Sequence, residues 1–274
     1  MNESNHDEGK ESDVKPFLVI QLRPEEATAD SEFAKILHYG QLSPDSVVRL
    51  RAEQKGLPEI HLDQYAGVIV GGSPFDISTP ADQKTAIQRE IEAGFQALFD
   101  DIVAMDFPFL GCCSGSGLLG HYLGASVSRK YAEPVSSVEI VLTEEGKNDP
   151  LLKAMPESFK VLTGHKEACD SLPESAILLA SNAQCPVQMF RVGKNVYATQ
   201  FHPEGDPEGF AVRIKVYRNH GYFPEETAAQ LIDAVTREYT PQAHAILARF
   251  VECYGKQGSN QHVSSQHVNG EDNG

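Results

Sequence analysis

The stretch FPFLGCCSGSGLLG, residues 107–120, constrains the fold more than any other part of the sequence, because an apolar run leads directly into a cluster of glycines. Counted from Gly111, the spacing G-x-C-x-G places Cys113 at the centre of a sharp turn from a strand into a helix. Small residues are needed on both sides of such a turn, which leaves the central side chain exposed above the sheet. The pattern predicts Cys113 as a candidate nucleophile. Ser114 lies one position out of register for that role, and we expect the strand to turn Cys112 into the sheet.

Short apolar runs alternate with longer stretches of helical periodicity in the first half of the sequence. Four such runs, which end in glycine or polar residues, lie at residues 17–23, 47–51, 67–72 and 107–112. Runs of this kind are typical of buried parallel strands. Residues 82–105 carry apolar side chains at helical spacing with charged residues between them, as expected of a helix that returns the chain to the next parallel strand.

The second half of the sequence has a different pattern. Apolar runs between residues 136 and 203 lie close together and are joined by short polar or glycine turns, which predicts an antiparallel section added to the sheet. Two closing helices are expected in residues 224–254, where each apolar-periodic stretch begins with proline. We therefore expect one α/β domain at about residues 16–255, with an open, mostly parallel sheet flanked by helices. The polar segments 1–15 and 256–274 have no such periodicity and are expected to be disordered.

Charge and cysteine content narrow the classes of function. With 23 Lys and Arg against 39 Asp and Glu, the formal net charge is −16, which disfavours nucleic acid as a partner. No apolar run approaches the roughly 20 residues of a membrane span, and the N-terminal sequence lacks the apolar core of a secretory signal. The five cysteines lack C-x-x-C spacing, so neither a disulfide framework nor a zinc site is indicated. We expect a cytoplasmic protein that uses no metal and no organic cofactor.

A base for the candidate nucleophile is offered by the stretch YATQFHPEGDP, residues 197–207. A nucleophilic cysteine needs a base and a group that orients the base. His202 and Glu204 lie two residues apart at the end of an apolar run, so both side chains can lie on one face. Open α/β sheets collect their chemistry at the carboxyl ends of strands. A third predicted strand ends in Gly71 and Gly72, whose backbone N–H groups can approach a substrate oxygen closely.

Together these stretches resemble class I glutamine amidotransferases of the free-standing kind, similar to the amidotransferase half of GMP synthase. The matching pieces are GVIVGGSP, FPFLGCCSG, GHKEACDSLP, LLASNAQCPVQMF and VYATQFHPE, which occur in the family's order within residues 17–215. The resemblance implies a flavodoxin-like sheet. It also implies that Cys113 is the nucleophile, that His202 is the general base and acid, and that Glu204 orients His202.

The resemblance implies a set of contacts around the substrate as well. Backbone N–H groups near Gly72 and of Ser114 would form the oxyanion hole. Gly71 and the loop that carries His165 would border the glutamine pocket. In the implied reaction, Cys113 attacks the side-chain amide of glutamine, ammonia leaves, and water hydrolyses the thioester.

The sequence departs from the family pattern G-x-C-x-G-x-Q at one position. Gly117 stands where the family has a glutamine that helps to hold the substrate. A hydrolase of γ-glutamyl peptides or conjugates is therefore an alternative, and a non-catalytic regulatory protein on the same fold is another. Ser73 also separates Gly72 from Pro74, which leaves open the N–H that completes the oxyanion hole. The roughly 40 residues after the resemblance ends are too few for a synthetase domain, so we expect either an ammonia-accepting site in a separate synthetase chain or simple release of ammonia.

Overall fold

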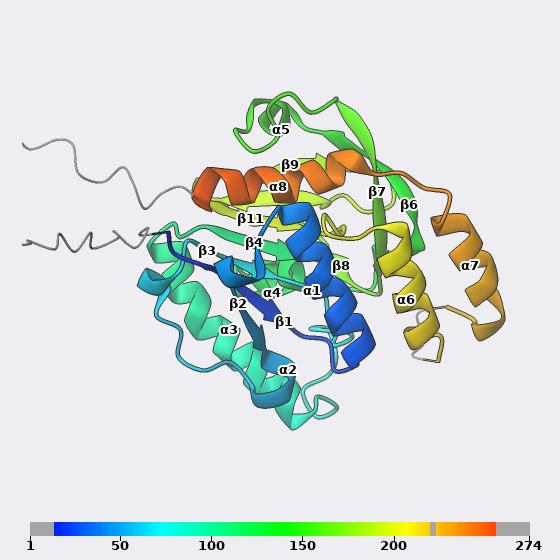
Figure 1. Ribbon diagram of the computed structural model, residues 1–274, viewed down its shortest axis with the longest axis horizontal. Helices are drawn as coiled ribbons and strands as arrows, with labels where there is room; N and C mark the ends of the chain where they lie inside the picture. The colour runs from blue at the N-terminus through cyan, green and yellow to red at the C-terminus, as the bar shows by residue number, and fades with distance from the viewer. Residues whose placement is uncertain (1–13, 220–222, 256–274) are drawn as a thin grey trace, which may run out of the picture.

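The computed structural model describes residues 14–219 and 223–255 and is centred on one mixed sheet (Figure 1). Its strand order is β2-β1-β3-β4-β11-β10-β9-β6-β7. The parallel part consists of β2 (Val47–Arg51), β1 (Phe17–Gln21), β3 (Gly67–Val70), β4 (Phe109–Cys112) and β11 (Val196–Thr199). The antiparallel part consists of β10 (Met189–Val192), β9 (Ala176–Ser181), β6 (Glu133–Leu142) and β7 (Ser158–His165). A small second sheet pairs β5 (Val127–Ser128) with β8 (Ala168–Cys169).

Helices cover both faces of the parallel part. One face packs against α2 (Ala52–Lys55), α3 (Ala86–Ala104) and α4 (Ser114–Tyr122), and the other packs against α1 (Glu26–Gly40) and α8 (Pro241–Gly255). The remaining helices are α5 (Glu144–Asn148), α6 (Pro207–Tyr217) and α7 (Ala228–Val235), with 3-10 turns at Pro44–Ser46, Leu62–Gln64 and Glu225–Thr227. Helix α6 lies beside α1, as Figure 1 shows. The expected α/β fold with a mostly parallel sheet between helical layers is confirmed.

Side chains that point alternately to the two faces of each strand explain why helices pack on both faces of the sheet. In β3, Val68 and Val70 enter the core under α3, whereas Ile69 enters the core under α1 and α8. Successive strand side chains point to opposite faces, so an all-apolar strand serves both cores. Cys112 follows the same rule, because it is 2% exposed and packs in the core under α1 and α8. The expectation that β4 turns Cys112 into the sheet is confirmed.

The predicted helix at residues 82–105 is α3, and its start is set by a cap. The Thr85 side chain accepts a hydrogen bond from the Gln88 backbone N–H, which satisfies one donor of the first helical turn. The helix therefore begins at Ala86 rather than at residue 82. Its buried side chains include Ile91, Phe95, Leu98 and Ile102, at the spacing of one helical face.

Strand β11 differs from the expectation in an instructive way. The apolar run that contains it was expected to belong to the antiparallel section, and β11 does pair antiparallel with β10. It also pairs parallel with β4, from Val196 opposite Phe109 to Thr199 opposite Cys112. The carboxyl ends of β4 and β11 therefore meet at the same edge of the sheet, beside the ends of β1 and β3.

A third, smaller core lies between α6, α7 and the sheet. It contains Leu162, Phe210, Ile214 and Val235.

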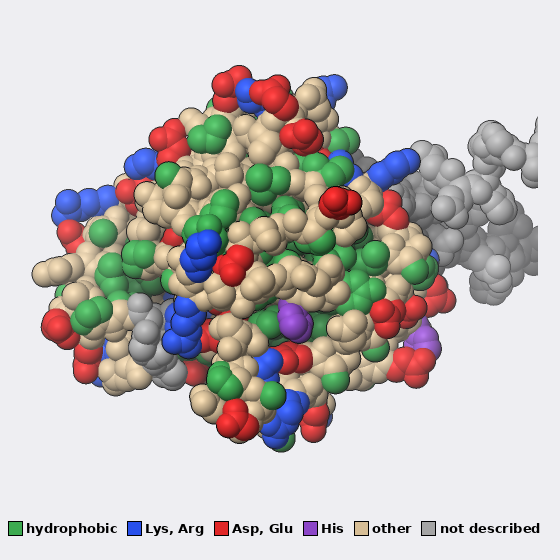
Figure 2. All heavy atoms as spheres, turned by 180° about the vertical axis from the view of Figure 1, so that it is seen from behind, with side chains coloured by type: hydrophobic (Ala, Val, Ile, Leu, Met, Phe, Trp, Pro, Cys, Tyr) green, Lys and Arg blue, Asp and Glu red, His purple; other side chains and the backbone are tan. Residues whose placement is uncertain are grey.

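Within the described part of the chain, no helix combines the length and the apolar character that crossing a lipid bilayer requires. The face turned away from α1 and α8 carries acidic and basic side chains of the described residues in small, interspersed groups (Figure 2). The segments expected to be disordered lie almost entirely outside the described residues.

Candidate active site

Cys113 occupies a strained turn between β4 and α4. Its backbone has φ 55° and ψ −95°, a conformation that side chains other than glycine rarely adopt. A Cβ atom on Gly111 would lie 2.7 Å from the Gly115 carbonyl carbon, and one on Gly115 would lie 3.2 Å from the Val70 Cβ. The two glycines are therefore needed so that strand and helix can approach each other. The strand–turn–helix unit expected from the sequence is confirmed, with Cys113 at its tip.

The Cys113 thiol lines a cavity rather than the core. The backbone N–H of Cys113 donates to the Thr199 carbonyl at 2.7 Å, which ties the turn to β11, and Gln200 Nε2 lies 4.0 Å from the sulfur. Burial raises the pKa of the thiol to about 12, while the charges of Arg23 and Arg213 act in the opposite direction. The resting group is therefore a neutral thiol, which needs a base before it can act as a nucleophile.

His202 lies just beyond β11, in the same cavity as Cys113. Its Nδ1 atom is 2.7 Å from Glu204 Oε1, and both side chains are buried. The Phe210 ring packs edge-on against the imidazole with the ring centroids 5.5 Å apart. Burial lowers the pKa of His202, although the Glu204 carboxylate opposes this shift. When Nδ1–H is donated to Glu204, Nε2 keeps the lone pair that a base requires.

Glu204 is shared between His202 and an arginine that the sequence did not reveal. Arg213 Nη2 lies 2.8 Å from the same Oε1 atom that contacts the histidine. Despite burial, these two partners hold the pKa of Glu204 well below its usual range, so the carboxylate is charged. Arg213 lies on α6 one helical turn after Phe210, so both side chains project from the same helical face toward the site.

The two candidate oxyanion-hole donors, the backbone N–H groups of Ser114 and Gly72, differ in whether they already have an acceptor. Ser114 is the first residue of α4, so its backbone N–H has no acceptor within the helix, and its hydroxyl donates to the Ser73 carbonyl at 3.3 Å. The Gly72 N–H instead donates to Glu32 Oε2 at 3.2 Å. Gly71 N–H donates to the Ile20 carbonyl. The structure therefore does not bring Gly71 or Gly72 into the cavity lining as the sequence suggested, whereas Ser73 and Ser114 both line it.

Gly117 lies in the cavity wall, where the sequence placed it. A Cβ atom there would meet only Glu167 Oε1, at 3.9 Å. The Glu167 carboxylate accepts hydrogen bonds from the backbone N–H groups of Ile77 at 2.6 Å and Ser78 at 2.8 Å. It thereby links the loop after β7 to the loop after β3. Sequence reasoning missed Glu167, although it lies within the matched stretch GHKEAC.

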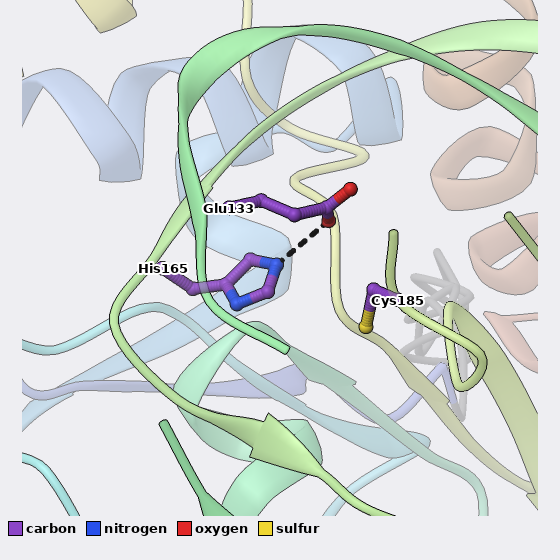
Figure 3. Close-up of side chains that lie close together, drawn as sticks. All are labelled: Glu133, His165 and Cys185. Carbon is purple, nitrogen blue, oxygen red and sulfur yellow. Dashed lines mark hydrogen bonds and ion pairs between the residues drawn. The ribbon is translucent and has the colours of Figure 1, made fainter. Parts of the chain in front are cut away.

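His165 lines the cavity but is held mainly by neighbouring protein groups. Its Nε2 lies 2.8 Å from Glu133 Oε2, and its Nδ1 lies 3.0 Å from the Glu167 carbonyl oxygen. Figure 3 shows the ring facing Glu133, and the Cys185 sulfur lies within 4.8 Å of both groups. Glu133 also accepts hydrogen bonds from Asn182 and Gln188. A direct substrate contact by His165 thus stays a prediction, and hydrogen bonding fixes the ring.

The other side chains that line the cavity include both charged and apolar groups. Arg23 follows β1 and pairs with Glu32 at 2.6 Å, and Lys166 pairs with Asp76 at 2.9 Å. Apolar side chains line the cavity as well, and several of them come from α6, beside Arg213 of the same helix. The apolar lining residues are Val135, Phe210, Ile214, Tyr217 and Phe223. The cavity lies at the carboxyl edge of the parallel strands, where this fold type binds its ligands.

Comparison with known proteins identifies the family. The model of the family described as glutamine amidotransferase class-I matches residues 35–214. One subunit of the glutamine-hydrolyzing GMP synthase of Methanosphaera stadtmanae is 31% identical over 148 residues, which cover 53% of this chain and 69% of that protein. Gamma-glutamyl peptidase 3 of Arabidopsis thaliana is 27% identical over 198 residues, which cover 66% of this chain and 76% of that protein.

A solved structure agrees at the level of the fold. The glutamine amidotransferase of Thermotoga maritima superimposes with a TM-score of 0.69 at 22% identity, over 88% of this chain and 98% of that chain. The elbow at Cys113 and the segment with His202 and Glu204 all lie inside the matched residues. The chain belongs to the class-I glutamine amidotransferase family.

Proposed function

We propose that this protein is a cysteine amidohydrolase that cleaves the side-chain amide of glutamine or of a γ-glutamyl compound. The observation that carries the proposal is the position of Cys113 at a positive-φ turn, in one cavity with a histidine whose Nδ1 is bonded to Glu204 at 2.7 Å. This arrangement meets the three needs of a nucleophile, a base and a group that orients the base. On this basis we propose Cys113 as the nucleophile, His202 as the base and Glu204 as the group that orients it.

In the first half of the reaction, His202 Nε2 takes the proton of the Cys113 thiol as the sulfur attacks the amide carbon. The carbonyl oxygen becomes an oxyanion, and the Ser114 N–H at the start of α4 is the donor best placed to stabilise it. The imidazolium then gives its proton to the leaving nitrogen, and the carbon–nitrogen bond breaks. The products of this half are a γ-glutamyl thioester and ammonia or an amine.

In the second half, water replaces the departed amine. His202 accepts a proton from the water as its oxygen attacks the thioester carbon, and the same proton returns to the sulfur as the carbon–sulfur bond breaks. Glutamate leaves and the thiol is restored. Glu204 stabilises the imidazolium in both halves without itself changing protonation, which agrees with the lowered pKa of its carboxyl group.

Two observations favour a substituted amide as the second candidate substrate. Gly117 leaves open space beside Glu167 in the cavity, where the family has a glutamine side chain. The leaving nitrogen must lie on the His202 side, because His202 protonates it, and there the Phe210 ring packs against the imidazole and lines the cavity. An apolar side chain there suits an amine substituent better than ammonia alone. A peptidase acting on γ-glutamyl compounds is among the relatives, which gives this candidate further support.

For ammonia there are two proposed destinations. The relatives that are single subunits of GMP synthase suggest a separate synthetase chain as partner, and release into solvent is the alternative. Co-purification with a synthetase, and glutaminase activity that rises on adding it, would favour delivery. The cytoplasm, as the compartment that supplies glutamine and keeps thiols reduced, remains the location that we expect.

The experiment that tests the proposal uses the full chain with glutamine, γ-glutamylglycine and γ-glutamyl isobutylamide, and measures ammonia, glutamate and free amine. Cys113→Ala removes the nucleophile, and Cys112→Ala is the matched control because Cys112 packs in the core on the other side of the turn. We expect turnover in the wild type and in Cys112→Ala, and a loss of at least about a thousandfold in Cys113→Ala.

The products decide between the candidates. Ammonia from glutamine as the fastest reaction supports the amidotransferase. A higher kcat/KM for the isobutylamide than for glutamine supports the hydrolase of substituted amides. Absence of turnover on all three compounds, together with no thioester trapped on Cys113, would overturn the proposal in favour of a regulatory protein on the same fold.

A further inference from the structure

A buried carboxylate from helix α1 lies beneath the candidate catalytic residues. Glu32 is 1% exposed. Its Oε2 atom accepts a hydrogen bond from Arg23 Nε at 2.6 Å and another from the Gly72 N–H at 3.2 Å. Arg213 Nη2 lies 3.7 Å from the same oxygen, and Gln21 Nε2 donates to Oε1 at 3.2 Å. One side chain thus contacts the ends of β1 and β3 and helix α6.

The glycine pair after β3 makes room for this carboxylate. A Cβ atom on Gly71 would collide with Glu32 Oε1, and one on Gly72 would collide with Arg23 Nη2. Gly72 also lies against the catalytic histidine, since its added Cβ would be 2.9 Å from His202 Cε1. The two glycines are therefore explained by the close approach of a buried ion pair to the backbone. This differs from the oxyanion role that the sequence suggested for Gly72.

Charges of alternating sign run from Glu32 to the histidine. Arg213 lies between two carboxylates, with Nη2 2.8 Å from Glu204 Oε1 and 3.7 Å from Glu32 Oε2. The same Glu204 oxygen holds His202. Arg23 adds a second positive charge, paired with Glu32 and close to Gly72, which also lies against His202. Two arginines and two carboxylates thus offset each other around the imidazole in a region with almost no access to water.

We propose that Glu32 is a positioning residue of the active site, which acts on His202 through Arg213 and Glu204. Through the Gly72 N–H it also fixes the start of the loop that carries Ser73. The proposal rests on the proposed function, because it assigns Glu32 a part in the reaction of Cys113. Glu32 itself does not line the cavity and is not expected to touch the substrate.

The charges around the histidine give the proposal a signature that a purely structural role would not have. His202 faces Glu204 in its own segment, Arg213 from α6, Arg23 from the segment after β1, and the Cys113 thiol across the cavity. Removing the Glu32 charge leaves the two arginines less compensated, which disfavours the imidazolium. Removing the Arg213 charge has the opposite effect, because Glu204 then acts on the histidine unopposed.

The test compares Glu32→Gln with Arg213→Met in the full chain, and measures kcat/KM as a function of pH. Glu32→Gln keeps the size of the side chain and removes its charge. We expect its acidic limb to move to lower pH by about half a unit, and that of Arg213→Met to move to higher pH by about one unit. Both variants should lose about tenfold or more in kcat. Glu26→Gln is the matched control, because Glu26 lies on the same helix with an exposed side chain.

A second readout keeps this test independent of turnover. The rate at which iodoacetamide modifies Cys113 is followed by peptide mass spectrometry at each pH. This rate reports the reactivity of the Cys113 thiol, on which the same charged groups act. We expect faster modification in Glu32→Gln and slower modification in Arg213→Met at a given pH. Shifts of the same sign in both variants, or no shift in either variant with the fold intact by circular dichroism, would overturn the role of Glu32. Opposite changes in the modification rates of the two variants, in a protein that turns over none of the substrates, would support the role of Glu32 and contradict the proposed function.

Discussion

Glu204 receives two buried partners on a single oxygen, with His202 Nδ1 at 2.7 Å and Arg213 Nη2 at 2.8 Å. Its other oxygen, Oε2, is buried and has no hydrogen-bond partner among the described residues. The arginine withdraws part of the negative charge that would otherwise stabilise the imidazolium. The site therefore favours a neutral thiol and a neutral imidazole at rest.

Glu204→Gln should reduce kcat/KM by roughly a hundredfold to ten thousandfold, because the amide neither fixes the tautomer of His202 nor stabilises the imidazolium. The side chain keeps its size, so KM should change much less than kcat. The matched control is Glu208→Gln, since the Glu208 side chain is 80% exposed and pairs with Lys35 at the surface. Steady-state kinetics on both variants, with circular dichroism to check the fold, measures the difference. Equal activities in the two variants would remove Glu204 from the mechanism.

The dependence of activity on pH should have an unusually low acidic limb. His202 must be neutral to take the proton, and burial lowers the pKa of its imidazole, so activity should persist to pH values below about 6.5. Burial raises the pKa of Cys113 to about 12, so spontaneous ionisation of the thiol is not expected to add a rise in activity near neutrality. A profile of kcat/KM from about pH 4.5 to about pH 9.5 checks both limbs. An acidic limb clearly above pH 6.5 would contradict the neutral resting histidine.

That the candidate catalytic residues lie in one cavity could be predicted from the sequence, because each of them follows a strand. The spacing around Cys113 reports a steric requirement, which the positive φ and the contacts of Gly111 and Gly115 bear out. His202 and Glu204 belong to one short segment, so their pairing is a local property of the chain. Local geometry of this kind is visible in a sequence pattern.

The supporting residues could not be predicted in the same way. Glu32 and Arg213 lie 181 residues apart in the sequence and meet only because α1 and α6 pack side by side. Nothing in the composition of either helix marks its charged residue as buried, since charged side chains on amphipathic helices usually face water. The same reason explains the reassignment of Gly72, whose N–H is taken by a helix that the strand pattern does not describe.

Two glycines of α4 should respond oppositely to alanine. A Cβ atom on Gly117 meets nothing closer than Glu167 Oε1 at 3.9 Å, so Gly117→Ala should raise the free energy of unfolding by about 0.5–1 kcal/mol through helix propensity. A Cβ atom on Gly120 would collide with the buried Cys169 Sγ, so Gly120→Ala should lower it by about 1–3 kcal/mol. Denaturant titrations of both variants measure the two changes. A destabilised Gly117→Ala would show that the cavity wall is tighter than the described contacts indicate.

Glu167 should control substrate binding through the loop after β3. Its carboxylate accepts the backbone N–H groups of Ile77 and Ser78, so Glu167→Ala leaves both donors without this acceptor and loosens a cavity wall. We expect KM to rise about tenfold, with a smaller change in kcat, and hydrogen exchange at these two amides to accelerate. Glu167→Gln retains one acceptor oxygen and should lie between the wild type and the alanine variant. Burial raises the pKa of Glu167, so the loss of wild-type affinity on acidification should begin above the usual range of a glutamate and be absent in Glu167→Gln. Unchanged exchange at Ile77 and Ser78 in the alanine variant would show that other contacts hold the loop.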